Sequence, residues 1–195
     1  MLIRSLTILF SIAVLLVAAT DTRAQDPDAM KLFKADVGDW NCEIRMFEPG
    51  SDQPQVSKGT ETNKMLGDMW LISHFKGEMM GMPFEGASFT GYNAETKKFH
   101  GTWIDSMSPF PMANEGNWDE TTRTMTSTGT GKDPTGAEMK YKMTMVHKDG
   151  ARHFTMFMVD DEDETKMMEI HYTRAKGESA KGESKAAPAG HDPMH

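Results

Sequence analysis

The sequence predicts an all-β protein, in which a single antiparallel meander of about ten strands closes into a barrel behind one short helix. Three observations predict this fold. The chain has 195 residues, which is enough for one domain. From residue 40 to residue 174, short stretches of alternating apolar and polar residues follow one another without a helical pattern between them. About ten strands in so small a domain would leave edges exposed unless the sheet closed on itself.

Residues 1–24 are predicted to be a secretory signal. Arg4 supplies the positive start, residues 6–19 are almost uninterruptedly apolar, and small residues permit cleavage after Ala24 or Ala19. The apolar run is shorter than the roughly 20 residues that a spanning helix needs. We therefore expect an exported protein, periplasmic or extracellular, without a stable membrane anchor. The net charge of -8 disfavours nucleic acid as a partner, because nucleic-acid binding requires basic patches.

The predicted domain covers residues 25–174 and begins with a short helix. Asp26 followed by Pro27 is a typical helix start, and Gly38 is a typical end. The apolar face of this helix consists of Met30, Phe33 and Val37.

The strands follow in regular succession. Alternation is clearest in the first strand, whose apolar face consists of Trp40, Cys42, Ile44 and Met46. Further strands are expected near residues 56–66, 69–76, 84–92, 97–105, 112–118, 123–129, 138–147, 152–159 and 166–174. Residues 175–195 contain the repeat AKGES and almost no apolar side chain, so we expect a disordered polar tail.

Two hairpins have a predicted register. With Asp149 and Gly150 in a type I′ turn, three apolar pairs share one face: Met145 with Phe154, Met143 with Met156, and Tyr141 with Met158. A two-residue turn at Gly67 and Asp68 would pair Met65 with Trp70, Asn63 with Ile72, and Glu61 with His74. The second register would place the polar pair Glu61 and His74 on a partly apolar face.

Methionine replaces the usual aliphatic core. After the predicted signal there are 18 Met, against 3 Leu, 4 Ile and 4 Val. Flexible Met side chains adapt to varied shapes, and a barrel of this size can hold one small ligand. We therefore expect a non-catalytic barrel that binds a small apolar or amphipathic molecule and needs no cofactor. The candidate lumen residues are Trp40, Glu61, His74, Trp103, Asp105, Tyr141, Met143, Met145, Phe154 and Met156.

Metal binding is an alternative function. Met79, Met80 and Met82 cluster in one predicted loop, and their soft sulfur atoms could bind Cu(I) or absorb oxidants. The histidines lack the spacing of a zinc motif. Four of them occupy strands and could converge only through the fold, namely His100, His147, His153 and His171.

Catalysis is the second alternative, although no nucleophile, phosphate-binding or dinucleotide-binding motif occurs in the exported part of the chain. The candidate groups are Glu61 with His74, and Asp105 beside Trp103, since a carboxylate next to an indole can act as an acid. Cys42 is expected to be inert packing. No reaction class follows from these residues, and no protein partner is indicated.

Several short segments resemble the bacterial domain-of-unknown-function family fifteen-seventy-nine. The segments are GASFTGYN at 86–93 and KKFHGTWIDS at 97–106, with shorter matches such as GDW at 38–40 and GMPFEG at 81–86. The resemblance runs from about Lys31 to Arg174, and Asn93 stands where the family pattern has Asp. It implies a lipocalin-like barrel and carries no catalytic residue or activity over to this chain.

Overall fold

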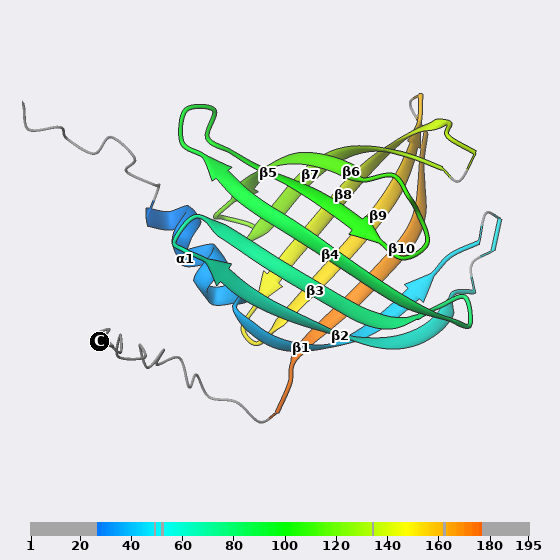
Figure 1. The fold of residues 1–195 in the computed structure, drawn as a ribbon, viewed down its shortest axis with the longest axis horizontal. Coiled ribbons are helices and arrows are strands. Elements are labelled where there is room, and N and C mark those ends of the chain that lie inside the picture. Colours follow the sequence, from blue (N-terminus) through cyan, green and yellow to red (C-terminus); the bar gives the residue numbers. More distant parts are fainter. Residues whose placement is uncertain (1–26, 49, 52, 134, 162, 177–195) are drawn as a thin grey trace, which may run out of the picture.

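The computed structural model is a closed barrel of ten antiparallel strands with one helix (Figure 1). It describes residues 27–176 except 49, 52, 134 and 162, so the predicted signal and residues 177–195 of the predicted tail lie outside the described part. The elements are α1 (Pro27–Asp36), β1 (Gly38–Met46), β2 (Gln55–Leu66), β3 (Trp70–Met79), β4 (Met82–Asn93), β5 (Lys98–Asp105), β6 (Met112–Asp119), β7 (Thr124–Lys132), β8 (Glu138–Lys148), β9 (Ala151–Asp160) and β10 (Asp163–Arg174).

The strands form an uninterrupted meander. Each strand pairs with the next in the chain, and β1 pairs with both β2 and β10 to close the ring. Closure gives every strand two neighbours, so that no edge is left to pair with another chain. The predicted all-β meander barrel with a short N-terminal helix is confirmed. Within the described part, no helix has both the length and the apolar character to span a membrane.

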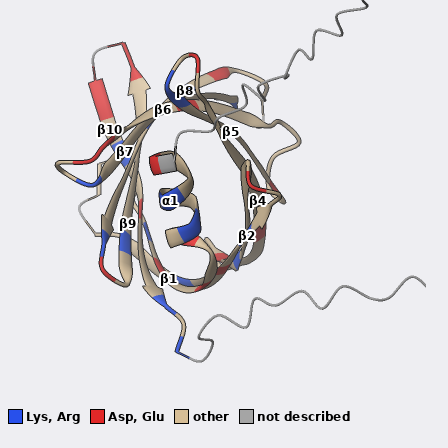
Figure 2. Ribbon diagram, turned by 90° about the vertical axis from the view of Figure 1, so that its left-hand side faces the viewer, with Lys and Arg blue, Asp and Glu red and all other residues tan. Residues whose placement is uncertain are grey.

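Helix α1 lies across one end of the barrel, inside the ring of strands seen in Figure 2. We call this end the floor; it also carries the β2–β3, β4–β5, β6–β7 and β8–β9 turns. The opposite end, called the mouth, carries the β1–β2, β3–β4, β5–β6, β7–β8 and β9–β10 connections. The floor is thus covered by a helix, and the mouth is framed by loops alone.

The apolar face of α1 packs against the strands around it. Ala29, Met30 and Phe33 form a buried cluster with Leu71 and Phe99. The rings of Phe33 and Phe99 meet edge to face, with centroids 5.6 Å apart. Burial of a side chain of this size contributes about 1.5–3 kcal/mol, so Phe33 fixes the helix as a plug in the floor.

The C-terminal end of α1 is held by a side chain from the last strand. Arg174 donates hydrogen bonds to the backbone carbonyls of Ala35 and Val37. These carbonyls are among those that a helix end leaves without an intrahelical partner. Gly38 follows with φ 119°, a conformation that favours glycine, and turns the chain directly into β1.

A second core cluster joins the wall strands at the closure of the barrel. It contains Trp40, Cys42, Ile44, Phe75, Phe84, Ile170 and Tyr172. The alternation predicted for β1 is observed. Trp40, Cys42 and Ile44 are buried and Met46 is half-buried, while Asn41 and Glu43 alternate with them on the other face.

The β8–β9 hairpin has the predicted register. Tyr141 lies opposite Met158, Met143 opposite Met156, and Met145 opposite Phe154. The turn type differs from the prediction. Among the two turn residues only Gly150 has a positive φ, 71°, whereas a type I′ turn requires positive φ at both positions.

The predicted register of the β2–β3 hairpin is wrong by one residue. Leu66 pairs with Trp70, so three residues form the turn instead of two. Glu61 therefore lies opposite Phe75 and faces the interior, while His74 lies opposite Thr62 and is exposed on the outside. A one-residue shift moves a strand residue to the other face of the sheet, so Glu61 and His74 do not form a pair.

Strand β10 contains an irregularity near its middle. The pairing with β9 shifts between Lys166 and Met168, which leaves Met167 as an extra residue. Such a bulge changes which side chains point inward. Both Met167 and Met168 consequently line the interior.

Candidate ligand site in the barrel lumen

The barrel encloses a cavity of about 620 Å³. Its lining begins at the floor with Phe33 and Asp36 of α1 and reaches Met107 and Phe110 in the β5–β6 connection at the mouth. Every strand contributes inward side chains to it. The cavity therefore extends along the barrel axis, between a helix at one end and loops at the other.

Methionine is the most frequent residue type in the lining of this cavity. The described methionines that line it are Met46, Met79, Met107, Met112, Met125, Met139, Met143, Met145, Met156, Met167 and Met168. Unbranched thioether side chains fill irregular space and repack around different shapes. The interior is thus apolar and deformable over most of its length.

Eight of the ten predicted lumen residues line this cavity: Glu61, Trp103, Asp105, Tyr141, Met143, Met145, Phe154 and Met156. The other two do not. Trp40 is buried in the wall, where it belongs to the core cluster at the barrel closure. His74 is exposed on the outer face because of the shifted β2–β3 register.

Trp103 and Asp105 form a fixed unit near the mouth. The Trp103 ring lies over Gly86, where an added Cβ would be 2.2 Å from the ring, so only glycine leaves room for it. Trp103 Nε1 donates to Asp105 Oδ2 at 2.9 Å, and the backbone amides of Met107 and Ser108 donate to Asp105 Oδ1. Oδ1 therefore holds the β5–β6 loop and Oδ2 holds the Trp103 ring, so both carboxylate oxygens have a structural role.

A buried polar group lies at the floor, which we call the floor network: Asp36, Glu61, Asn63, His147 and Arg152. Arg152 donates to Asp36 Oδ2 at 3.1 Å and to Glu61 Oε1 at 2.7 Å. Asn63 Nδ2 donates to Glu61 Oε1 at 2.9 Å and to the backbone carbonyl of Asp36 at 3.2 Å. The network joins α1 to β2, β8 and β9.

Two aromatic rings enclose the Arg152 guanidinium, which lies 4.0 Å from the ring centroid of Trp40 and 4.5 Å from that of Tyr172. Such cation–π contacts are strongest where water is excluded. Burial by itself would lower the pKa of Arg152, but the carboxylates of Asp36 and Glu61 outweigh it and raise the pKa. Arg152 is therefore a permanent buried cation.

Three side chains near the floor, those of His147, Cys42 and Tyr172, are held in their uncharged forms. Burial lowers the pKa of His147, although Asp36, whose Oδ1 lies 3.5 Å from His147 Nδ1, opposes this shift. Burial raises the pKa of the Cys42 thiol to about 12 and that of Tyr172 well above its ordinary value. Cys42 thus stays a thiol, as expected for inert packing.

Two buried polar atoms of the floor network have no hydrogen-bond partner among the described residues: Arg152 Nε and Asn63 Oδ1. A buried donor or acceptor without a partner costs about 1–3 kcal/mol. Arg152 lines the cavity. The Arg152 side chain therefore forms part of the polar end of the lumen, while its Nε atom is buried.

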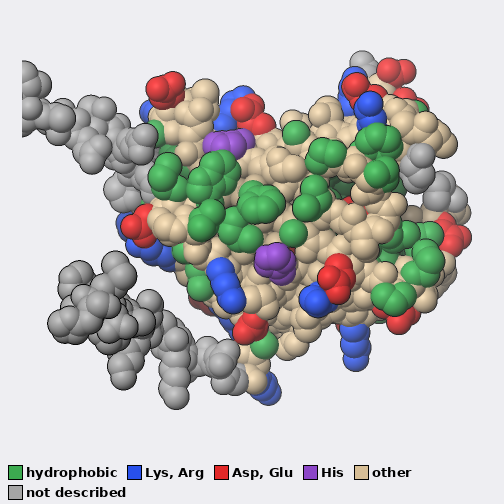
Figure 3. Space-filling model, in the orientation of Figure 1, with side chains coloured by type: hydrophobic (Ala, Val, Ile, Leu, Met, Phe, Trp, Pro, Cys, Tyr) green, Lys and Arg blue, Asp and Glu red, His purple; other side chains and the backbone are tan. Residues whose placement is uncertain are grey.

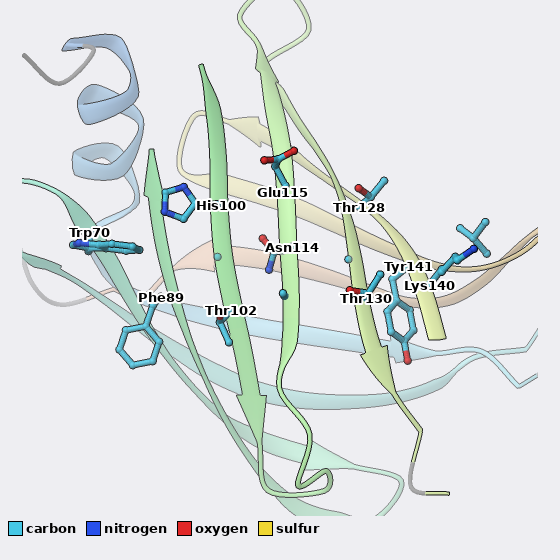
Figure 4. Close-up of a pocket in the computed structure, with 14 residues that line it drawn as sticks. Trp70, Phe89, His100, Thr102, Asn114, Glu115, Thr128, Thr130, Lys140 and Tyr141 are labelled. Carbon is cyan, nitrogen blue, oxygen red and sulfur yellow. The ribbon is translucent and has the colours of Figure 1, made fainter. Parts of the chain in front are cut away.

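A second, shallower groove of about 920 Å³ crosses the outer face of the barrel from β3 to β9 (Figure 4). Trp70, Phe89 and His100 form one end of it, and Thr130 and Lys140 lie toward the other. Hydrophobic side chains also gather on the face shown in Figure 3, and Phe89 and Ile104 are among the exposed ones. The lumen is the stronger candidate site, because it lies inside the barrel and ends on buried charge.

The three methionines of the predicted copper-binding loop, at the β3–β4 turn, differ in their surroundings. Met79 packs against the core cluster and lines the cavity, whereas Met80 and Met82 are 60% and 49% exposed. A Cu(I) ion shared by all three sulfur atoms would have to draw Met79 out of this packing.

The family can be assigned from the sequence as a whole. The profile of the family described as "Protein of unknown function (DUF1579)" matches residues 27–174. The chain belongs to this family. No curated protein matches the chain in sequence.

Two solved structures share the fold of this DUF1579 member. The crystal structure of Rv2717c from M. tuberculosis has a TM-score of 0.61 at 11% identity and covers 77% of this chain and 99% of its own. The S-type phycobiliprotein lyase CPES from Guillardia theta has a TM-score of 0.53 at 9% identity, with 77% and 94% covered. At these identities the likeness extends to the barrel fold alone.

Four residues of the floor network were not among the lumen residues predicted from the sequence of this DUF1579 member: Asp36, Asn63, His147 and Arg152. A signal existed for two of them. The predicted β8–β9 register places His147 opposite Arg152 on the face of Met145 and Phe154, and a charge on an apolar face indicates a buried partner. Nothing local in the sequence indicates that the partners of Arg152 are in α1 and β2.

Proposed function

We propose that this protein is exported and carries a small amphipathic molecule in the lumen of its barrel. The observation that carries the proposal is the methionine-lined cavity of about 620 Å³ inside the barrel, which ends on the floor network. Small-molecule sites are typically clefts of roughly 300–1,000 Å³ with a mainly apolar lining and a few polar groups that fix orientation. The segment at residues 1–24 supports export.

The floor network favours an uncharged polar group on the ligand. Two carboxylates, Asp36 and Glu61, surround one guanidinium, and the lowered pKa of His147 keeps that ring neutral. An anionic head group would therefore meet excess negative charge. The side chains of Arg152 and His147 line this end of the cavity and can hydrogen-bond with a neutral polar group.

Two related fluorescent probes test this proposal. N-phenyl-1-naphthylamine is uncharged, and 1-anilinonaphthalene-8-sulfonate has the same rings with an added sulfonate. We expect the uncharged probe to bind at least about tenfold more tightly, a difference of roughly 1.4 kcal/mol. Stronger binding of the sulfonate would contradict the predicted polarity of the floor.

A matched pair of variants tests whether the probe binds inside the lumen. Ser127 lines the cavity, and its neighbour Thr128 is exposed on the outer groove. Ser127→Phe fills the lumen and should abolish probe binding, whereas Thr128→Phe adds the same ring outside and should leave binding unchanged. If both variants bound the probe like the natural protein, the lumen would not be the site.

The residues proposed for catalysis are not placed where they could act together. Glu61 and His74 lie on opposite faces of the wall, and Asp105 is engaged by three hydrogen bonds. The likeness to a phycobiliprotein lyase rests on the fold and supports no choice of substrate for this chain.

A further inference from the structure

We propose that His153, Glu169 and His171 bind a divalent transition-metal ion on the outer face of the barrel, with Zn²⁺ and Cu²⁺ as the ions that fit best. The three residues come from two adjacent strands. His153 of β9 lies directly opposite His171 of β10, and Glu169 precedes His171 by two residues on the same face. This site is separate from the lumen and does not depend on the proposed function.

The ligand atoms are already close together. One ring nitrogen of each histidine and one carboxylate oxygen lie within 4.8 Å of one another. Zinc binds such atoms at about 2.0–2.2 Å, which places neighbouring ligand atoms roughly 3–3.5 Å apart. Rotation of side chains at the surface can close the remaining gap, because His171 is exposed and the other two residues are half-buried.

The two imidazoles lie against each other on the outer face of the barrel. Their ring centroids lie 4.2 Å apart, and His153 Nε2 is buried without a hydrogen-bond partner among the described residues. Two imidazoles with a carboxylate form a donor set that suits Zn²⁺ and Cu²⁺.

The surrounding charges define what a metal ion must displace. Lys166 Nζ donates to Glu169 Oε1 at 2.8 Å. Glu43 of β1 lies opposite His171, but Arg45 already binds its carboxylate at 2.7 Å. The site therefore has three protein ligands with water completing the coordination, and Lys166 competes with the metal for Glu169.

Zinc titration of the full, untagged chain against a chromophoric chelator tests the proposal. His191 and His195 could bind the same ions, so both are changed to Ala in the background protein. We expect one Zn²⁺ per chain, and His153→Ala and His171→Ala should each weaken binding at least about tenfold, the effect typical of losing a metal-site contact. His74→Ala removes another exposed histidine and should leave the affinity unchanged.

A second variant predicts a change in the opposite direction. Lys166→Gln frees the Glu169 carboxylate and removes a nearby cation, so Zn²⁺ should bind more tightly. With Cu²⁺ in place of Zn²⁺, electron paramagnetic resonance should show two nitrogen ligands, and one in His171→Ala. Unchanged affinity in His153→Ala, or weaker binding in Lys166→Gln, would overturn the assignment.

Discussion

Arg152 joins α1 to the wall of the barrel at the floor, through ion pairs, hydrogen bonds and aromatic contacts. It binds Asp36 of the helix and Glu61 of β2, and its guanidinium lies over the rings of Trp40 and Tyr172. A buried ion pair of this kind adds little stability over an apolar replacement of the whole group, but the loss of one partner leaves an uncompensated charge. Arg152 is therefore the residue whose single substitution should disturb the floor most.

The first prediction concerns this charge. Arg152→Met should destabilise the protein by about 3–5 kcal/mol, because it leaves two buried carboxylates without their cation. Urea denaturation at pH 7 measures the effect. Arg45→Met is the control, since Arg45 forms a single surface ion pair with Glu43 and should change stability by about 1 kcal/mol or less. Equal losses of stability in the two variants would contradict the prediction, because the buried ion pairs would then contribute no more than a surface pair.

At the scale of elements, the β8–β9 hairpin separates a lumen face from a solvent face. Met143 is 6% exposed and lines the cavity, whereas its neighbour Lys142 faces outward and pairs with Glu164 at 2.9 Å. The register repeats this division along both strands. Substitutions at these adjacent positions should therefore have different physical consequences.

The second prediction uses these positions. Met143→Ala should cost about 2 kcal/mol, at the low end for a buried methionine, because the new space joins an existing cavity. Met143→Lys should cost more, since it places a charge in the apolar lumen. Lys142→Met should cost about 1 kcal/mol or less, because it removes an exposed ion pair. Chemical denaturation ranks the three variants, and a larger loss for Lys142→Met than for Met143→Ala would contradict the face assignment.

At the scale of the whole molecule, closure of the barrel places α1 and the charged floor network at one end of the apolar lumen. The net charge of the chain is -8, and its buried charges are concentrated at the floor network. Any change in the protonation of this network alters the stability of the entire barrel, because its members hold α1 against three strands.

The third prediction is a pH dependence that follows from His147. Its pKa in the folded protein is lowered from about 6.5, so the unfolded chain binds a proton more readily than the folded chain. Stability should be complete above about pH 6.5 and should fall as the pH is lowered below that value. His147→Gln should reduce this loss in denaturation curves measured between pH 7 and pH 5. A pH dependence that is the same in both proteins would show that His147 does not cause it.

Local patterns in the sequence were sufficient for the architecture. Alternation of side chains with a period of two is a property of each strand alone, so it predicted the strands and their inward faces. The β8–β9 register was predictable because three apolar pairs agree on one alignment. The β2–β3 register was not, since both Met65 and Leu66 offer an apolar residue next to the turn and the pattern does not distinguish two turn residues from three.

Only the tertiary structure decided which side chains meet inside and outside the barrel. Arg152 contacts Glu61 and Asp36 across 91 and 116 residues of chain, and the ring must close before these groups become neighbours. The His153, Glu169 and His171 cluster depends in the same way on the β9–β10 register and its bulge. The sequence by itself determined a methionine-rich barrel of about ten strands, because strand alternation is local; the charged floor and the surface histidine pair depend on contacts between strands, which no single strand encodes.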